Sequence, residues 1–135
     1  GSKKYREQAK SLGIENIFFL DFADNVHDFL SSLNVFAHGR RDGEVCSSAI
    51  IEALYHGLPV ISHPAENMGH VEQIEGCGKI CETADDYADE MQNFLIQRSY
   101  LEDLSHNAKQ RYLERYDYTK IKDAILSIYS NVLRH

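Results

Sequence analysis

Apolar residues occur in short continuous runs in the first part of the chain and at helical spacing in the last part. Short apolar runs bounded by Gly, Pro, Asn or Asp are typical of buried strands, whereas a recurrence every three or four positions is typical of helices. This pattern predicts strands over residues 17–20, 34–38, 60–62 and 79–81.

Two helices are predicted before the second strand. Residues 3–12 form a charged surface helix that Gly13 ends. A short helix follows Asp24 or Asn25, since either side chain can accept from the free N–H groups of a first turn, and it ends near Ser32.

The central helix is predicted over residues 49–55, which are apolar apart from Glu52. Ser47 or Ser48 precedes it as an N-cap whose hydroxyl accepts from a backbone N–H group. Gly57 follows it as a stop signal. A short helix is also expected over residues 69–74. The residues between the second strand and the central helix, 39–46, and those between the third strand and this short helix, 63–68, are expected to be loops.

The last part of the chain is predicted to be helical, beginning with a capping box formed by Thr83 and Asp86. The buried stripe of that helix is expected to be Tyr87, Met91, Phe94 and Leu95. The next helix is expected to bury Leu101, Leu104, Ala108, Tyr112 and Leu113. Thr119 is expected to cap a last helix with the apolar face Ile121, Ala124, Ile125, Ile128, Tyr129 and Val132.

Strands that alternate with helices predict the α/β class, a Rossmann-like doubly wound parallel sheet of about four strands with helices on both faces. Ligands of such sheets bind at the carboxyl ends of the strands. We therefore expect the loops over residues 21–25, 38–44 and 63–69 to converge on one crevice.

Composition narrows the function further. The 135 residues suffice for one domain with a single core, and 43% of them are hydrophobic. A net charge of −7 without a basic cluster argues against nucleic acid as a partner. Cys46, Cys77 and Cys81 show no C-x-x-C spacing and are expected to be free thiols, so we expect a cytoplasmic location. Gly1 and Ser2 are either native or an expression scar.

Two carboxylates bracket the start of the central helix. Glu44 precedes it and Glu52 lies inside it, and eight residues at helical rise span roughly 12 Å. The helix N-terminus between them favours an anion. This order of carboxylate, anion cradle and carboxylate suits a sugar–diphosphate–ribose ligand.

These residues resemble a family. Glu44 and Glu52, with the segment Ala53, Gly57, Leu58, Pro59, Val60 and Ile61 that follows, resemble the E-x7-E segment of retaining GT-B glycosyltransferases of the group 1 type. Residues 13–20 resemble a strand of the same family. That family includes capsule and lipopolysaccharide sugar transferases.

The resemblance implies that residues 1–135 are the nucleotide-sugar donor-binding domain, the C-terminal part of a longer two-domain enzyme. Of the six strands usual in that domain, in the order 3-2-1-4-5-6, only the last four are found, and the acceptor domain and an upstream Arg and Lys pair are missing. Such a fragment is expected to bind donor at most. Bare sheet edges beside Phe18 and Phe36 invite pairing, so we expect a homodimer, a strand swap or a rearranged strand order there.

The resemblance also assigns roles. Glu44 would contact the transferred sugar as the catalytic residue, and Glu52 would bind the ribose. Backbone N–H groups would face the diphosphate at Cys46, Ser47 and Ser48. Further donor contacts are expected at Arg40, Arg41, Asn67 and Gly69, with Glu72 lining the site or structural and the base against Phe22.

The reaction implied is hexosyl transfer from a nucleotide-sugar with retention, in cell-surface polysaccharide or lipopolysaccharide biosynthesis. No cofactor or obligatory metal is expected, and His38, His63 and His70 lack the spacing of metal ligands. The acceptor would be lipid-linked, which would place the whole protein at the inner face of the membrane.

Two other functions stay open. A nucleotide-sugar epimerase shares the architecture, although the E-x7-E spacing argues against it. A non-enzymatic α/β binding module is the other alternative, and a receiver-like version would need a phosphoacceptor for which Asp21 is a poor candidate. Hydrolysis is not favoured, because no Ser or Cys lies in a nucleophile elbow.

Overall fold

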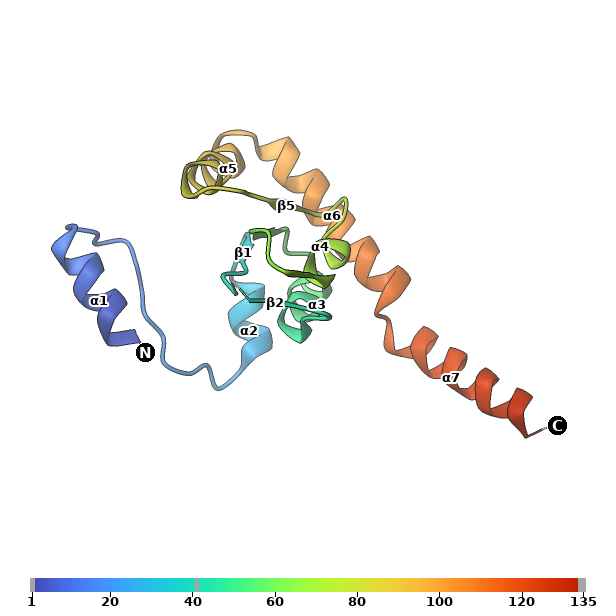
Figure 1. The fold of residues 1–135 in the computed structure, drawn as a ribbon. Helices are drawn as coiled ribbons and strands as arrows, with labels where there is room; N and C mark the ends of the chain where they lie inside the picture. Colours follow the sequence, from blue (N-terminus) through green and yellow to red (C-terminus); the bar gives the residue numbers. More distant parts are fainter. Residues whose placement is uncertain (1, 41, 134–135) are drawn as a thin grey trace.

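The computed structural model describes residues 2–40 and 42–133, which form a small α/β body with a helix projecting from each end (Figure 1). The elements in chain order are α1 (Ser2–Ser11), α2 (Val26–Ser31), β1 (Phe36–Ala37), β2 (Gly43–Glu44), α3 (Ser48–Tyr55), β3 (Val60–Ser62), β4 (Asn67–Met68), α4 (Gly69–Gln73), β5 (Gly78–Ile80), α5 (Ala84–Ile96), α6 (Arg98–Arg115) and α7 (Tyr118–Val132).

The main sheet is parallel, with the order β1-β3-β5. Phe36 pairs with Val60, and Val60 pairs in turn with Gly78. Neighbouring residues of the central strand point to opposite faces, as a strand requires. Val60 belongs to a core cluster with α2, α3 and α6, whereas Ile61 packs with α5 and the first half of α6. Helices therefore cover both faces, as predicted.

The first predicted strand is absent, because residues 17–20 adopt no regular structure. Phe18 is 87% exposed, and within the described ranges no strand lies beside it. Instead, the Arg6 guanidinium donates to the Phe19 carbonyl at 2.9 Å and lies over the Phe19 ring. This segment therefore runs along α1, apart from the sheet (Figure 1). A strand needs a hydrogen-bonded neighbour, which an apolar run alone cannot supply.

A second, two-stranded parallel sheet lies in segments that were predicted to be loops. Gly43 pairs with Asn67, and Glu44 pairs with Met68. Gly43 has φ +73°, and an added Cβ atom would collide with the Asn67 carbonyl oxygen. At Gly69 the same atom would collide with the Val45 carbonyl oxygen. These two glycines let the loops after β1 and β3 lie against one another.

Helix caps follow the local sequence closely. Asn25 is the N-cap of α2, which decides between the two predicted residues. Thr83 and Asp86 form the predicted capping box of α5. The cap of α7 is Asp117, whose carboxylate accepts from two N–H groups, and not Thr119. A carboxylate two residues upstream therefore takes the role that was predicted for the hydroxyl.

The apolar stripes are only partly buried. Phe94 is buried, but Leu95 is 86% exposed and Met91 and Leu113 are also exposed. The other buried residue of α5 is Glu90, whose carboxylate accepts a hydrogen bond from Tyr100 at 2.7 Å.

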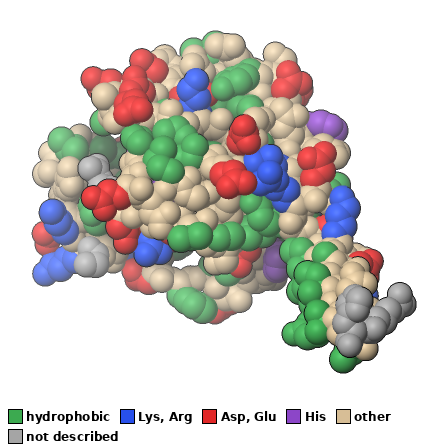
Figure 2. All heavy atoms as spheres, turned by 45° about the vertical axis from the view of Figure 1, so that its right-hand side comes forward, with side chains coloured by type: hydrophobic (Ala, Val, Ile, Leu, Met, Phe, Trp, Pro, Cys, Tyr) green, Lys and Arg blue, Asp and Glu red, His purple; other side chains and the backbone are tan. Residues whose placement is uncertain are grey.

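The expected apolar face of α7 has no partner in the described structure. None of its residues is buried, and the helix projects from the body (Figure 1). Figure 2 shows hydrophobic side chains gathered along it. Among the described helices, none combines the length and the apolar character that crossing a bilayer demands.

Candidate functional site

Glu44 lies on β2, just before the amino end of α3, with its side chain 18% exposed. Arg40 donates to it and also to Asp42, at 2.9 Å from Nε to Oδ1. The Ser47 side chain and Arg40 lower the pKa of Glu44 below its ordinary value. Glu44 is therefore ionised at neutral pH, and the guanidinium of Arg40 is already neutralised by two carboxylates.

The start of α3 is held by a side chain from α4. Ser47 is buried and is the N-cap, but its hydroxyl makes no capping hydrogen bond, and Ser48 is the first helical residue instead of a cap. The Ser47 N–H donates to the Gln73 Oε1 atom at 2.7 Å. The predicted capping by a serine hydroxyl is therefore wrong, and a distant amide instead holds the backbone of the N-cap residue itself. Cys46 and Ser48 are exposed.

Glu52 is exposed in the second turn of α3. One turn further, His56 hydrogen-bonds to Ser31 and to His27 of α2, at 3.1 and 3.0 Å. Burial lowers the pKa of His56, His27 and Lys109 lower it further, and the charge of Glu52 acts against these effects. Glu52 thus lies on solvent-exposed surface near the contact between α2 and α3.

The loop after β3 comes to the same place as Glu44. Asn67 is exposed on β4, and Gly69 begins α4 against the backbone of Val45. The structure therefore brings Asn67 and Gly69 beside Glu44, although the sequence separates them by more than twenty positions. Arg41, the remaining predicted contact, lies outside the described residues.

Glu72 points away from this loop. Its carboxylate accepts from Arg115 of α6 at 2.6 Å, which lowers the pKa of Glu72. Arg111 of α6 donates to the Glu72 carbonyl. These contacts attach α4 to α6, so the structural role is the one that the geometry supports.

Three histidines, His38, His63 and His70, lie near one another and close to Glu44. His38 is buried at the end of β1, 3.3 Å from the Ser62 hydroxyl, and its ring centroid is 5.7 Å from that of His70. Burial lowers the pKa of His38, His70, His63 and Arg40 lower it further, and Glu44 opposes them. In the part of the chain that the structure describes, no group of three His, Cys, Asp or Glu side chains could hold a metal ion.

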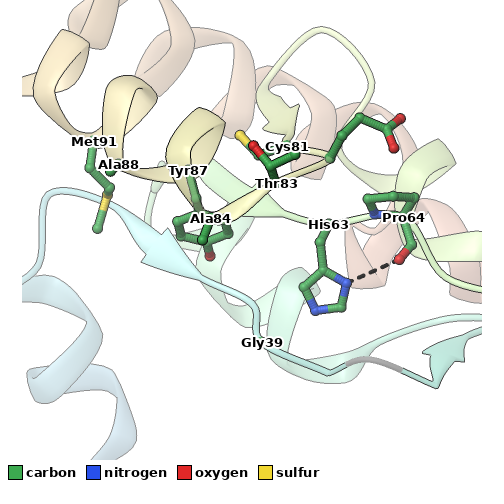
Figure 3. A pocket seen from close by; sticks show the side chains of 10 residues that line it. Gly39, His63, Pro64, Cys81, Thr83, Ala84, Tyr87, Ala88 and Met91 are labelled. Carbon is green, nitrogen blue, oxygen red and sulfur yellow. Dashed lines mark hydrogen bonds between the residues drawn. The ribbon is translucent and has the colours of Figure 1, made fainter.

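The carboxyl ends of the three strands of the main sheet open into a cleft of about 590 Å³ (Figure 3). Its walls come from the residues that follow β1, β3 and β5 and from the first turns of α5. Cys81 lines it as a free thiol, and burial raises its pKa. Glu44 and Glu52 do not line it.

A family model described as "Glycosyl transferases group 1" matches residues 1–111. This chain belongs to the group 1 glycosyltransferases. The matched residues of this glycosyltransferase chain include both Glu44 and Glu52 and every strand of the structure. A search of curated proteins found no match.

Solved structures show the same fold for this group 1 glycosyltransferase chain. It is similar to the Anabaena protein Alr3699/HepE in complex with UDP-glucose, with a TM-score of 0.82 and 23% identity. Crystal structures of that protein with UDP and glucose and with UDP give TM-scores of 0.82 and 0.80, both at 24% identity. Each covers 96% of this chain and 36% of the other, so this chain spans about a third of that relative's length.

Proposed function

We propose that residues 1–135 are the nucleotide-sugar donor-binding domain, the C-terminal part of a longer two-domain glycosyltransferase. The observation that carries this proposal is the position of two acids around the amino end of one helix. Glu44 lies before the amino end of α3, and Glu52 lies exposed in its second turn. The exposed Ser48 stands between them.

In this proposal each group takes one part of the donor. The ionised Glu44 accepts from hydroxyl groups of the transferred sugar, and Glu52 accepts from those of the ribose. The diphosphate lies against the amino end of α3, where the first N–H groups have no partner within a helix and the dipole favours negative charge. Ser48 supplies such a group, and the N–H of Cys46 lies just before the helix, whereas the Ser47 N–H shapes the loop through Gln73.

The reaction we propose is transfer of a hexosyl group with retention and without an obligatory metal. Its transition state places positive charge on the sugar and negative charge on the leaving phosphate. The α3 amino end stabilises the leaving charge, as oriented N–H donors do in a site that excludes water. Arg40 first has to exchange Asp42 or Glu44 for a phosphate, and Arg41 is the second proposed cation. Asn67 and Gly69 complete the wall of the donor site.

The donor we propose is a UDP-hexose, because the similar Anabaena structure contains UDP-glucose. The acceptor is a lipid-linked sugar of cell-surface polysaccharide or lipopolysaccharide synthesis, met at the cytoplasmic face of the membrane. An N-terminal domain supplies the acceptor site, so residues 1–135 alone bind donor without turnover. The exposed edge of β1 and the apolar residue Phe18 are covered by that remaining part or by a second copy.

Titration of the ¹⁵N-labelled chain with UDP, UDP-glucose, ADP and GDP tests the donor site. Uridine ligands are expected to shift the amide signals of residues 44–52. Glu52→Gln should weaken UDP and UDP-glucose alike, by about tenfold, as loss of a charged hydrogen bond implies. Glu44→Gln should weaken UDP-glucose by a similar factor and leave UDP unchanged.

Glu66→Gln is the matched control, since Glu66 is exposed in a neighbouring loop. If no nucleotide shifts residues 44–52, the donor site is wrong and a non-enzymatic binding module becomes the better account. Equal weakening of UDP by both variants at residues 44 and 52 would contradict the division of roles between sugar and ribose.

A further inference from the structure

The cleft at the carboxyl ends of β1, β3 and β5 is separate from the donor site proposed above. Its volume of about 590 Å³ is in the range of small-molecule sites, which measure about 300–1,000 Å³. Gly39, His63 and Thr83 line it, and each of them follows the end of a different strand of the main sheet. Ligands of doubly wound sheets bind at this end of the strands, so the cleft has both the size and the place of a binding site.

The charges around the cleft disfavour an anion. Among the described residues that line it, none is Lys or Arg, and Glu82 carries the only formal charge. Asp85 and Asp86 follow in the first turn of α5, and Asp86 together with Thr83 already occupies that helix end through the capping box. A phosphate group would therefore meet acidic side chains and a helix end that is already capped. These charges accordingly argue against an anionic ligand in this cleft.

Apolar side chains also line the cleft. Tyr87 and Met91 face the cleft from α5, and Pro64 closes its other side (Figure 3). The Tyr87 hydroxyl donates to the Ile61 carbonyl at 3.0 Å, which fixes its ring in place. Flat apolar walls next to polar atoms suit a ring with C–H groups on its face and hydroxyl groups on its edge.

His63 supplies a hydrogen-bond acceptor that lacks a donor. Its Nδ1 atom lies 3.1 Å from the Pro64 carbonyl oxygen, which can only accept, so Nδ1 carries the proton (Figure 3). In the neutral imidazole Nε2 is then an acceptor, and it is buried without a partner. Likewise, the Nε2 atom of the fully buried His70 donates to the His63 carbonyl, and its Nδ1 atom is left without a partner.

The space beside Gly39 shows where a donor can enter. The imidazole of His63 projects from the end of β3 toward the Gly39 segment (Figure 3). A Cβ atom added at Gly39 would have no atom within 4 Å, so this side of the cleft is open.

We propose that this cleft binds a neutral pyranose sugar unit, with one of its hydroxyl groups donating to His63 Nε2 and its apolar face against Tyr87 and Pro64. The binding goes beyond the proposed donor site and does not depend on it.

Titration of the ¹⁵N-labelled 135-residue chain with methyl glycosides of glucose, galactose and N-acetylglucosamine tests this inference. At about pH 8 an ordinary imidazole is neutral. At least one glycoside at millimolar concentration is expected to give saturable shifts at Gly39, Thr83 and Ala84, and to move the ¹⁵N signal of His63 Nε2. Inorganic pyrophosphate is expected to leave these signals unchanged.

Three variants separate contact from folding. His63→Phe keeps a ring but removes the acceptor, and Gly39→Val fills the open side, so each should weaken glycoside binding at least about tenfold. His63→Gln keeps an acceptor near the Nε2 position and should retain binding within about threefold. Unchanged signals outside the cleft report that each variant is folded.

The inference is overturned if none of the three glycosides shifts the cleft signals in the unaltered chain, or if pyrophosphate shifts them instead. It is also overturned if His63→Phe and His63→Gln bind a glycoside equally well. UDP titrated into the same samples reports on residues 44–52. A failure of the donor site and a failure of this cleft are therefore distinguished.

Discussion

The carboxamide of Gln73 holds the backbone of Ser47 at both of its polar groups. Its Oε1 atom accepts from the Ser47 N–H at 2.7 Å, and its Nε2 atom donates to the Ser47 carbonyl at 3.2 Å. Both residues are buried. A side chain of α4 thereby fixes the residue from which α3 starts, and with it the path of the loop that carries Glu44.

Gln73→Ala removes both hydrogen bonds and leaves the buried Ser47 N–H without a partner, whereas the Ser47 carbonyl still accepts from the Ile51 N–H at 3.2 Å. The expected loss is about 1–3 kcal/mol in the free energy of unfolding, measured by urea denaturation. Gln92→Ala, at an exposed position of α5, is the control and should change the free energy by less than about 0.5 kcal/mol. Equal stability of the two variants would show that this amide contributes nothing.

Gly69→Ala places a Cβ atom against the backbone of Val45, which cannot yield without moving the loop of Glu44. The expected cost is about 1–3 kcal/mol of stability, as for other overpacked sites. Gly39→Ala is the matched control, because the added atom there meets open space. Thermal unfolding measures both, and an unchanged midpoint for Gly69→Ala would contradict the close approach of the two loops.

Acid should destabilise the fold through His38. Burial lowers its folded-state pKa below the ordinary value of about 6.5, so between these two values the unfolded chain binds more protons. Stability is therefore full above about pH 6.5 and falls as the pH decreases toward the folded-state pKa. His56 has a lowered pKa as well and acts in the same direction.

His38→Asn, which keeps a polar group near the Ser62 hydroxyl, should reduce the loss of unfolding free energy between pH 7 and pH 5, the window around about 6.5. Urea denaturation at several pH values measures that slope. The exposed His106 provides the control variant, His106→Asn. An unchanged slope in His38→Asn would show that His38 titrates alike in the folded and unfolded chains.

Asp117→Ala should loosen the first turn of α7, since the Asp117 carboxylate accepts from the N–H groups of Thr119 and Lys120. The expected loss is about 1 kcal/mol of local helix stability, seen as faster amide exchange. Asp117→Asn should restore most of the protection, and Thr119→Ala should have little effect. If Thr119→Ala lost more protection from amide exchange than Asp117→Asn, Thr119 would be the cap.

Local features of this fold follow from the sequence because their partners are neighbours in the chain. The capping box of Thr83 and Asp86 spans three residues, and the strand of Val60 lies between Gly57 and a polar loop. Non-local features did not follow. Residues 17–20 have the composition of a strand, but whether they form one depends on a neighbour that no local pattern reveals.

The candidate site shows the same difference between local features, which the sequence indicates, and non-local ones, which it does not. The spacing of Glu44 and Glu52 pointed to the amino end of α3, and their roles remain predictions. The hydrogen bonds between Gln73 and Ser47 join residues 26 positions apart, so no local pattern in the sequence indicates them. The two-residue strands β2 and β4 are too short for any period of hydrophobicity, and the unpartnered nitrogen of His63 depends on a carbonyl geometry that only the structure shows.

The short pairing of β2 with β4 ties the connection after β1 to the connection after β3. Because Glu44 pairs with Met68, a ligand that displaces Glu44 also displaces Met68 and the start of α4, which follows Met68 directly. A substrate that binds at Glu44 would therefore displace both connections together. An insertion in either connection would require a matching change in the other.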